Sequence, residues 1–218
     1  MNRIMRTDLN GIDVPLTVAV MGDTHIKKPR GGLASDDLDA IRGVKPDLIL
    51  HTGDIVDLSV LDALEMIAPV FAVRGNRDFA HWRQLPAVRL FEYGDTEICL
   101  LHGHGTLPQY LRMKVSYWRG KLNPRFISRQ LPPEAAESDI VLFGHSHIPQ
   151  IWTEDGKLFI NPGAFSEGSP GDRFRFPAFA WFRLEPSRRI IAEILFKQDY
   201  WHVYCNKEID WKINGGTL

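Results

Sequence analysis

The most constraining feature of this sequence is an apolar run that stops at two histidines. Val141–Phe143 is followed directly by Gly144-His145-Ser146-His147. The apolar run predicts a buried strand, and the glycine lets the backbone turn sharply where that strand ends. Histidines at that point stand at the edge of a sheet, where α/β folds usually bind their ligands. A single such strand end is weak evidence, so the other strand ends of the chain decide its meaning.

Four more predicted strands end in side chains that can bind metals. Each strand is a short apolar or β-branched run, and a glycine stands just before the polar residue in most of them. The candidates are Asp23 and His25 after Leu16–Gly22, Asp54 after Asp47–His51, Asn76 after Val70–Val73, and His102 after Glu97–Leu101. Gly22, Gly53, Gly75 and Gly144 would let several backbones crowd toward one point.

Carboxylates, imidazoles and one amide make a mixed nitrogen and oxygen ligand set. Such a set suits manganese, iron, zinc, nickel or cobalt, and it fits calcium or a cysteine-rich zinc site poorly. Seven donors exceed the needs of one tetrahedral ion. They suffice for two ions that share a carboxylate, as in phosphatases and nucleases, where the metals lie about 3.5–4 Å apart.

Each candidate also has a simpler interpretation when it is taken alone. Asp54 could be a helix N-cap, Asn76 a turn residue, and His25 or His102 an ordinary loop histidine. The joint pattern favours a site, because independent accidents seldom all fall at strand ends. Three further histidines lack this context and are interpreted as ordinary ones, namely His51, His81 and His202.

The order of the predicted elements indicates an α/β (α+β) fold. Strands and helices alternate in the early part, including a helix capped by Ser35 and running to about Gly43, which predicts parallel strands with right-handed crossovers. The later part reads as hairpins and predicts antiparallel strands. We expect a single domain over residues 1–218, with a C-terminal tail at about 198–218 that the pattern does not place.

Bulk composition excludes several other classes of protein. The chain has 218 residues, 44% of them hydrophobic, and a formal net charge of −1, so nucleic-acid binding is not indicated. Two cysteines are too few for a disulfide framework. No segment approaches the roughly 20 apolar residues of a membrane span, and no apolar stretch follows the N-terminal arginines. We expect a cytoplasmic protein.

A basic, aromatic insertion at about 106–133 is not explained by the strand pattern. It contains six Lys or Arg and no acidic residue. One interpretation is a cap that recruits an anionic substrate, with Arg112, Lys114 and Arg119 as candidate contacts. The other is an amphipathic helical segment packed on the body or on a second subunit, which leaves a homo-oligomer open.

The polar motifs, taken in order, resemble those of the calcineurin-like metallophosphoesterase family, in particular its small bacterial and archaeal phosphodiesterase branch. The matching motifs are Asp23-x-His25, Gly53-Asp54-x-x-Asp57, Gly75-Asn76-Arg77-Asp78, His102-Gly103-His104, Gly144-His145-Ser146-His147 and Asn161-Pro162-Gly163-Ala164. The resemblance covers roughly residues 16–196. It implies a four-layer α/β/β/α sandwich of two mixed sheets flanked by helices.

The resemblance also implies roles for individual residues. One divalent ion would be held by Asp23, His25, Asp54 and His147, and the other by Asp54, Asn76, His102 and His145, with Asp54 bridging. Manganese is the first candidate, with iron, zinc, nickel, cobalt or magnesium as the others. A metal-bridging hydroxide would attack a small phosphorylated substrate in line. Asp57 and Asp78 would orient ligands or loops, and His104 would face the substrate.

Arg77 departs from the broader family, in which many members have histidine at this position. Arginine cannot protonate a leaving group, but it can clamp phosphate oxygens; a solvated arginine on a turn is the simpler interpretation. Gly75-Asn76-Arg77-Asp78-Phe79 also resembles the lipid A pathway enzymes that cleave UDP-2,3-diacylglucosamine, although the rest of the chain is less like them. The function expected first is phosphodiester hydrolysis. A pyrophosphohydrolase of nucleotide-linked or lipid-linked substrates comes second. A non-catalytic scaffold like the retromer subunit of this fold comes third, although intact Asp23 and His25 argue against it.

Overall fold

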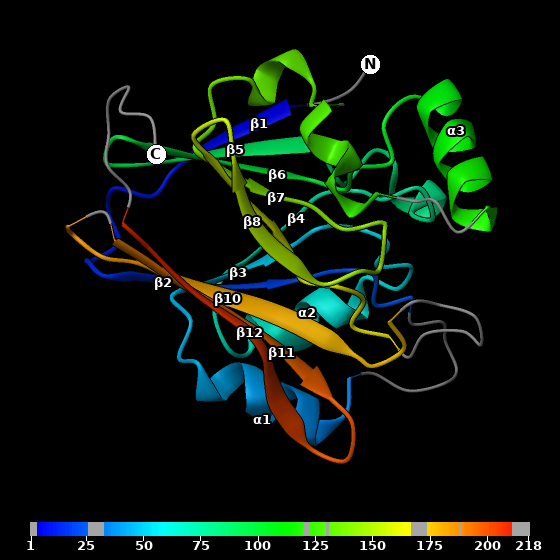
Figure 1. The fold of residues 1–218 in the computed structure, drawn as a ribbon. Coiled ribbons are helices and arrows are strands. Elements are labelled where there is room, and N and C mark those ends of the chain that lie inside the picture. The colour runs from blue at the N-terminus through cyan, green and yellow to red at the C-terminus, as the bar shows by residue number, and fades with distance from the viewer. Residues whose placement is uncertain are drawn as a thin grey trace.

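Two six-stranded sheets are stacked against each other in the computed structural model of this chain (Figure 1). The structure describes residues 4–25, 33–119, 123–129, 131–166, 174–187 and 189–210. The first sheet has the order β1 (Ile4–Asp8), β5 (Val88–Tyr93), β6 (Thr96–Leu101), β7 (Ile140–Leu142), β9 (Lys157–Asn161) and β8 (Gln150–Glu154). The second has the order β12 (Trp201–Asp210), β11 (Arg189–Lys197), β10 (Ala178–Leu184), β2 (Leu16–Met21), β3 (Leu48–His51) and β4 (Val70–Ala72).

Both sheets are mixed, as the order of elements predicts. In the second sheet β2, β3 and β4 run parallel, whereas β10, β11 and β12 add to them as antiparallel strands. In the first sheet β6, β7 and β9 are parallel, and β5–β6 and β8–β9 are antiparallel pairs. β1 lies at the edge, parallel to β5.

Alternating side chains of β2 show how the layers are held together. Val18 and Val20 pack into the apolar core between the two sheets, whereas Ala19 and Met21 point to the opposite face and pack against helices, because successive side chains of a strand point to opposite sides. The helices on that outer face are α1 (Ser35–Gly43) and α2 (Ser59–Glu65) (Figure 1).

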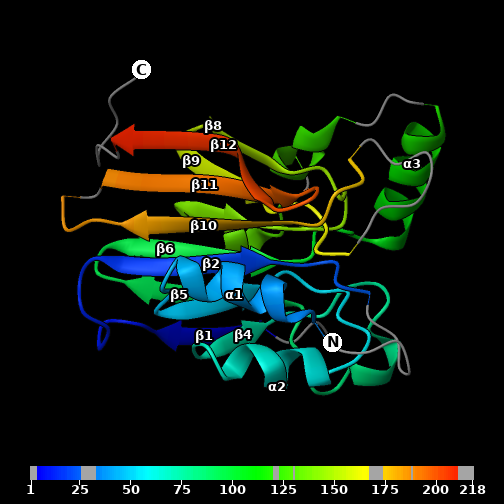
Figure 2. The same ribbon diagram turned by 90° about the horizontal axis from the view of Figure 1, so that it is seen from below.

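The outer face of the first sheet is covered by short 3₁₀ helices. These are η2 (Pro124–Arg129) and η3 (Pro133–Ala135), which bury Ile127 and Ala135 against Val141 and Phe143. Both sheets are thus covered on the outside, and the predicted four-layer fold is confirmed. The longest described helix, α3 (Leu107–Trp118), stands at one end of the sheets (Figure 2).

Two local predictions differ from the structure. Ser35 is not a cap, because α1 begins at Ser35 itself after Ala34, and no side chain caps the helix. The acidic first turn of α1 is paired with Lys197 on β11, which contacts Asp36 and, at 2.6 Å, Asp37. The segment expected as a tail contains β12, whose residues pair with β11 along its length. Residues 211–218 lie outside the described part of the chain.

No helix within the described ranges is long and apolar enough to cross a membrane.

Candidate metal centre

The seven candidate ligands meet at one edge of the stacked sheets. Four follow strands of the second sheet: Asp23 and His25 after β2, Asp54 after β3, and Asn76 after β4. Three follow strands of the first sheet: His102 after β6, and His145 and His147 after β7. They converge because the carboxyl ends of parallel strands point in the same direction.

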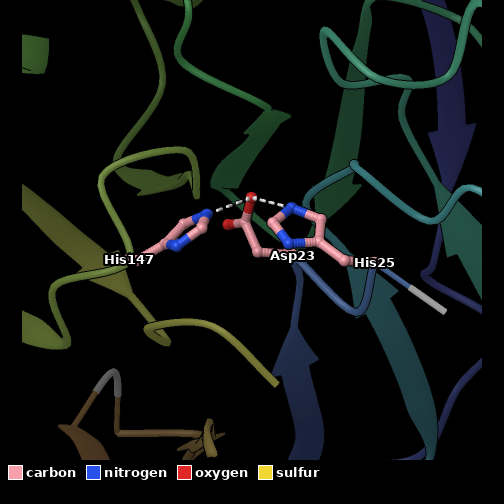
Figure 3. Close-up of side chains that lie close together, drawn as sticks. All are labelled: Asp23, His25 and His147. Atoms are coloured by element: carbon pink, nitrogen blue, oxygen red, sulfur yellow. Dashed lines mark ion pairs between the residues drawn. The ribbon is translucent and has the colours of Figure 1, made fainter. Parts of the chain in front are cut away.

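Asp23, His25 and His147 form the first group of ligand atoms (Figure 3). Oδ1 of Asp23 lies 3.6 Å from Nε2 of His25 and 3.3 Å from Nε2 of His147. Asp23 is fully buried, and its other oxygen accepts a hydrogen bond from the backbone N–H of His145 at 2.9 Å. Asp23 therefore contacts loops from both sheets.

Nε2 of His102 is the centre of the second group. It lies 3.0 Å from Oδ1 of Asn76, 3.2 Å from Nδ1 of His145 and 3.5 Å from Oδ1 of Asp54. His102 donates its Nδ1 proton to the carbonyl oxygen of Thr52 at 2.9 Å. That bond leaves the Nε2 lone pair directed at the group, as expected of a metal-ligating histidine.

Asp54 connects the two groups. Its Oδ1 faces His102, and its Oδ2 lies 3.3 Å from Nε2 of His25 in the first group. The side chain is almost entirely buried. One carboxylate thus presents one oxygen to each group, which is the arrangement that a bridging ligand needs.

Several acceptor atoms of the site lie close together without a donor between them. Oδ1 of Asp23 is buried without a hydrogen-bond partner among the described residues. In the second group, the oxygens of Asn76 and Asp54 face the lone pair of His102, so acceptors oppose acceptors. Divalent ions among these atoms would turn the repulsion into ligation, and the residues therefore fit such ions.

The pKa values of the candidate ligands are shifted by burial and by the neighbouring ligands. Burial alone would raise the pKa of Asp23, but His147 and His25 hold it well below its usual range. Burial would lower the pKa of His25, yet the carboxylates of Asp23 and Asp54 raise it to about 9. Burial, followed by the neighbouring His102, keeps the pKa of His145 well below its usual range. Ionised carboxylates and neutral imidazoles are the forms that bind metals, so Asp23 and His145 are already in the binding form, whereas His25 would release its proton when an ion binds.

The backbone of the ligand loops is held in an uncommon conformation. Five candidate ligands have the positive φ angles that non-glycine residues rarely adopt, namely Asp23, His25, Asp54, His145 and His147. The crowding predicted from the glycines is also present. A Cβ on Gly75 would lie 2.1 Å from Oδ1 of Asp54 and 2.4 Å from its backbone nitrogen. Such local strain gathers at functional sites.

Asp78 holds the loop that carries Asp54. It is buried and accepts four backbone N–H bonds, from Asp54, Ile55 and Val56 at 2.9 Å and from Gly75 at 2.7 Å. Asp57 acts further away, where it accepts bonds from the backbone and hydroxyl of Ser59 at the start of α2. Of the two, Asp78 is the one that contacts the Asp54 loop directly.

Arg77 and His104 lie beside the ligands. The backbone N–H of Arg77 donates to Oδ1 of Asp54 at 2.7 Å, and its half-exposed guanidinium approaches Oδ2 at 3.6 Å. The ring of His104 lies 5.4 Å from that of His102. Burial lowers the pKa of His104 to about 4, and its buried Nδ1 has no partner among the described residues.

The three basic residues singled out in the insertion are exposed, Arg112 and Lys114 on α3 and Arg119 just after it. Of the three, Lys114 contacts an aromatic side chain: its Nζ lies 5.0 Å from the centre of the Tyr110 ring. The ring of Tyr110 in turn lies 5.6 Å from that of His145. Neither Arg112 nor Arg119 has such a contact in the described part of the chain.

Sequence reasoning missed several residues that support the ligands. Thr52 binds His102 through its carbonyl oxygen, and the hydroxyl of Ser166 donates to the carbonyl of Asp23 at 2.9 Å. Buried Asn161 donates to the carbonyl of Gly144 at 3.0 Å and to Oγ of Ser146 at 2.9 Å, so it holds the loop between His145 and His147. Asn161 alone had a sequence signal, its Asn-Pro-Gly turn.

His51 is an ordinary buried histidine, as interpreted from the sequence. It accepts a hydrogen bond from the backbone of Gly53 at 3.1 Å and contacts the hydroxyl of Thr24 at 3.4 Å. Burial lowers its pKa to about 4. It supports the turn before Asp54 without joining the ligand groups.

Comparison with known proteins agrees with this geometry. Residues 16–184 match the model of the calcineurin-like phosphoesterase superfamily domain. The chain belongs to this superfamily. A probable metallophosphoesterase of Methanothermobacter thermautotrophicus is 31% identical over 151 residues, which cover 68% of this chain and 77% of the relative. A probable metallophosphoesterase of Methanocaldococcus jannaschii is 30% identical over 149 residues, 68% of each chain.

Solved structures share the fold of this calcineurin-like chain. Vacuolar Protein Sorting 29 of Cryptosporidium parvum superposes with a TM-score of 0.70 at 20% identity, covering 91% of this chain and all of that one. Wild-type Vps29 of Entamoeba histolytica, solved with zinc, gives 0.66 at 22% identity, covering 90% of this chain and all of that one. At such identities the likeness concerns the fold alone, and function has to be argued from the site.

Proposed function

We propose that this calcineurin-like chain is a dinuclear metal-dependent phosphodiesterase. The observation that carries the proposal is the placement of Asp54, whose two oxygens face the two ligand groups. Asp23, His25, Asp54 and His147 would hold one ion, and Asp54, Asn76, His102 and His145 the other. The mixed nitrogen and oxygen ligand set suits manganese, iron, zinc, nickel or cobalt, and manganese is the ion we favour for the first test.

When bound, the ions would lower the pKa of a water nucleophile and neutralise phosphate oxygens. Two side chains of the protein, those of Arg77 and His104, would contact the substrate directly. Arg77 presents a half-exposed, permanently charged guanidinium beside Asp54, suited to clamp a phosphate oxygen and stabilise charge that develops on it. His104 is neutral at ordinary pH and has an unpartnered ring nitrogen, so it can share a hydrogen bond with the substrate.

Hydrolysis by metal-stripped protein reloaded with manganese tests the proposal. A nitrophenyl phosphodiester, the corresponding monoester and a UDP-sugar pyrophosphate should be compared. We expect diester cleavage that a chelator abolishes and manganese restores. Cleavage of the pyrophosphate alone would favour the pyrophosphohydrolase. Two bound metals without turnover of any of the three compounds would contradict the phosphodiesterase assignment. No metal binding at all would favour a non-catalytic scaffold.

Arg77→Ala should lower kcat/KM for the diester about tenfold to a hundredfold, because a hydrogen bond to a charged group contributes about 1.5–3 kcal/mol. The bound metal content should stay the same, since the backbone N–H that contacts Asp54 remains in place. Arg83→Ala is the matched control, an exposed arginine six residues away on the same segment. Equal losses in the two variants would mean that Arg77 acts only through general surface charge.

A further inference from the structure

The insertion reaches the candidate metal centre through one aromatic side chain. Tyr110, in the first half of α3, lies with its ring 5.6 Å from the ring of His145, tilted by 42°. Tyr110 is half-buried, whereas Leu111 and Arg112 beside it are exposed. Tyr110 is therefore on the side of α3 that faces the site, which stands at the same end of the sheets (Figure 2).

Lys114 follows Tyr110 by four residues and so lies on the same face of the helix. Its Nζ is 5.0 Å from the centre of the Tyr110 ring, within the range of a cation–π contact. The other two basic candidates of the insertion point elsewhere. At about 100° per residue, Arg112 is turned about 200° from Tyr110, and Arg119 lies beyond the last residue of α3.

The charge of Lys114 is not neutralised by an acidic side chain in the described part of the chain. None of the ion pairs there involves Lys114, and the segment from Thr106 to Pro133 contains no Asp or Glu. Arg125, in the same insertion, is occupied elsewhere, 5.8 Å above the ring of Trp152. Lys114 is thus an exposed cation that contacts the aromatic ring lying beside His145, and it is available to an external anion.

We propose that Lys114, positioned by Tyr110, binds a second anionic group of the substrate, namely a phosphate next to the one that is attacked. The inference rests on the proposed phosphodiesterase function and narrows its substrate to phosphodiesters that carry a further phosphate beside the one that is attacked. Two cations would then contact the substrate, Arg77 from the loop after β4 and Lys114 from α3. The seven candidate ligands would engage the first phosphate through the ions that they hold, and Lys114 recognises the second.

Binding of two unreactive or slowly reacting nucleotides isolates this contact. AMP carries one phosphate, and the α,β-methylene analogue of ADP carries two and resists hydrolysis. Their affinities for the manganese-loaded full-length protein can be compared by calorimetry at one fixed ionic strength. We expect Lys114→Gln to lower the ratio of the two affinities about tenfold, the equivalent of one charge-assisted contact. Arg112→Gln, an exposed arginine of the same helix, should change it less than about twofold.

Tyr110 supplies a second pair of variants. Tyr110→Phe keeps the ring and should keep the affinity ratio, whereas Tyr110→Leu should lower it in the same direction as Lys114→Gln. An unchanged affinity ratio in Lys114→Gln would overturn the proposal. An equal drop in Arg112→Gln would also overturn it, since it would indicate a non-specific electrostatic attraction by the whole helix. Measuring the ratio of the two affinities requires no turnover by the enzyme. Failure of the proposed enzymatic function would appear separately, as absent manganese-dependent hydrolysis by the wild type.

Discussion

Asp54→Asn should reduce manganese-dependent phosphodiester hydrolysis about a thousandfold or more. The substitution keeps the size of the side chain but removes the charge that faces both ligand groups. Metal ions contribute several kcal/mol of charge stabilisation in such reactions, and each 1.36 kcal/mol corresponds to about tenfold in rate. The measurements are kcat/KM for the nitrophenyl diester and the metal content of the purified protein, which should fall below two ions per chain.

Asp62→Asn is the control for this variant, because Asp62 is an exposed aspartate on α2. It should leave both rate and metal content unchanged. If Asp54→Asn retained two ions and full activity, the bridging role of Asp54 would be wrong. If it lost both ions and kept its activity, the reaction would not depend on the metal centre.

Asp78→Asn should destabilise the protein by about 3 kcal/mol. Each carboxylate oxygen of Asp78 accepts two backbone N–H bonds, and the amide would turn one of those acceptors into a donor that faces two donors. Leaving buried donors unpaired costs about 1–3 kcal/mol for each group. For a chain of this size the melting temperature should fall by roughly 6–12 °C. Denaturant and thermal unfolding of the metal-free protein measure the loss without any contribution from metal binding.

Asp39→Asn provides the comparison, because the Asp39 side chain is 70% exposed and pairs with Arg42 on the surface of α1. We expect a change within about 0.5 kcal/mol. Equal unfolding free energies for the Asp78 and Asp39 variants would show that the loop carrying Asp54 does not depend on these four bonds.

The strand ends could be predicted because their signal is local. An apolar run, a glycine and a polar residue within a few positions, as at Val141–His147, define a buried strand and the place where it stops. Once neighbouring strands are parallel, their carboxyl ends lie at the same edge of the sheet, so the sequence pattern places Asp23 close to Asp54. The mixed character of the sheets follows from the spacing of elements in the same way.

Other features depend on contacts that no local pattern contains. Asp78 was expected to orient a loop, but its four bonds arise only because residues 54–56 fold back over it. The approach of Tyr110 to His145 depends on where α3 lies in space. β12 was missed because its polar and aromatic sequence reads as a tail; it forms by pairing with β11 at the edge of the second sheet. Tertiary context overrides propensity most strongly in such edge strands.

Each sheet presents only part of the ligand set, four side chains from the second and three from the first. The sheets are hydrogen-bonded within themselves and meet through apolar side chains such as Phe182 and Leu142. Bound ions would therefore connect the two sheets, because each sheet supplies part of the ligand set. Ion binding and sheet stacking become one coupled equilibrium, because whatever binds the stacked state alone also stabilises it. A substitution in the apolar layer between the sheets thus alters metal affinity without touching a ligand.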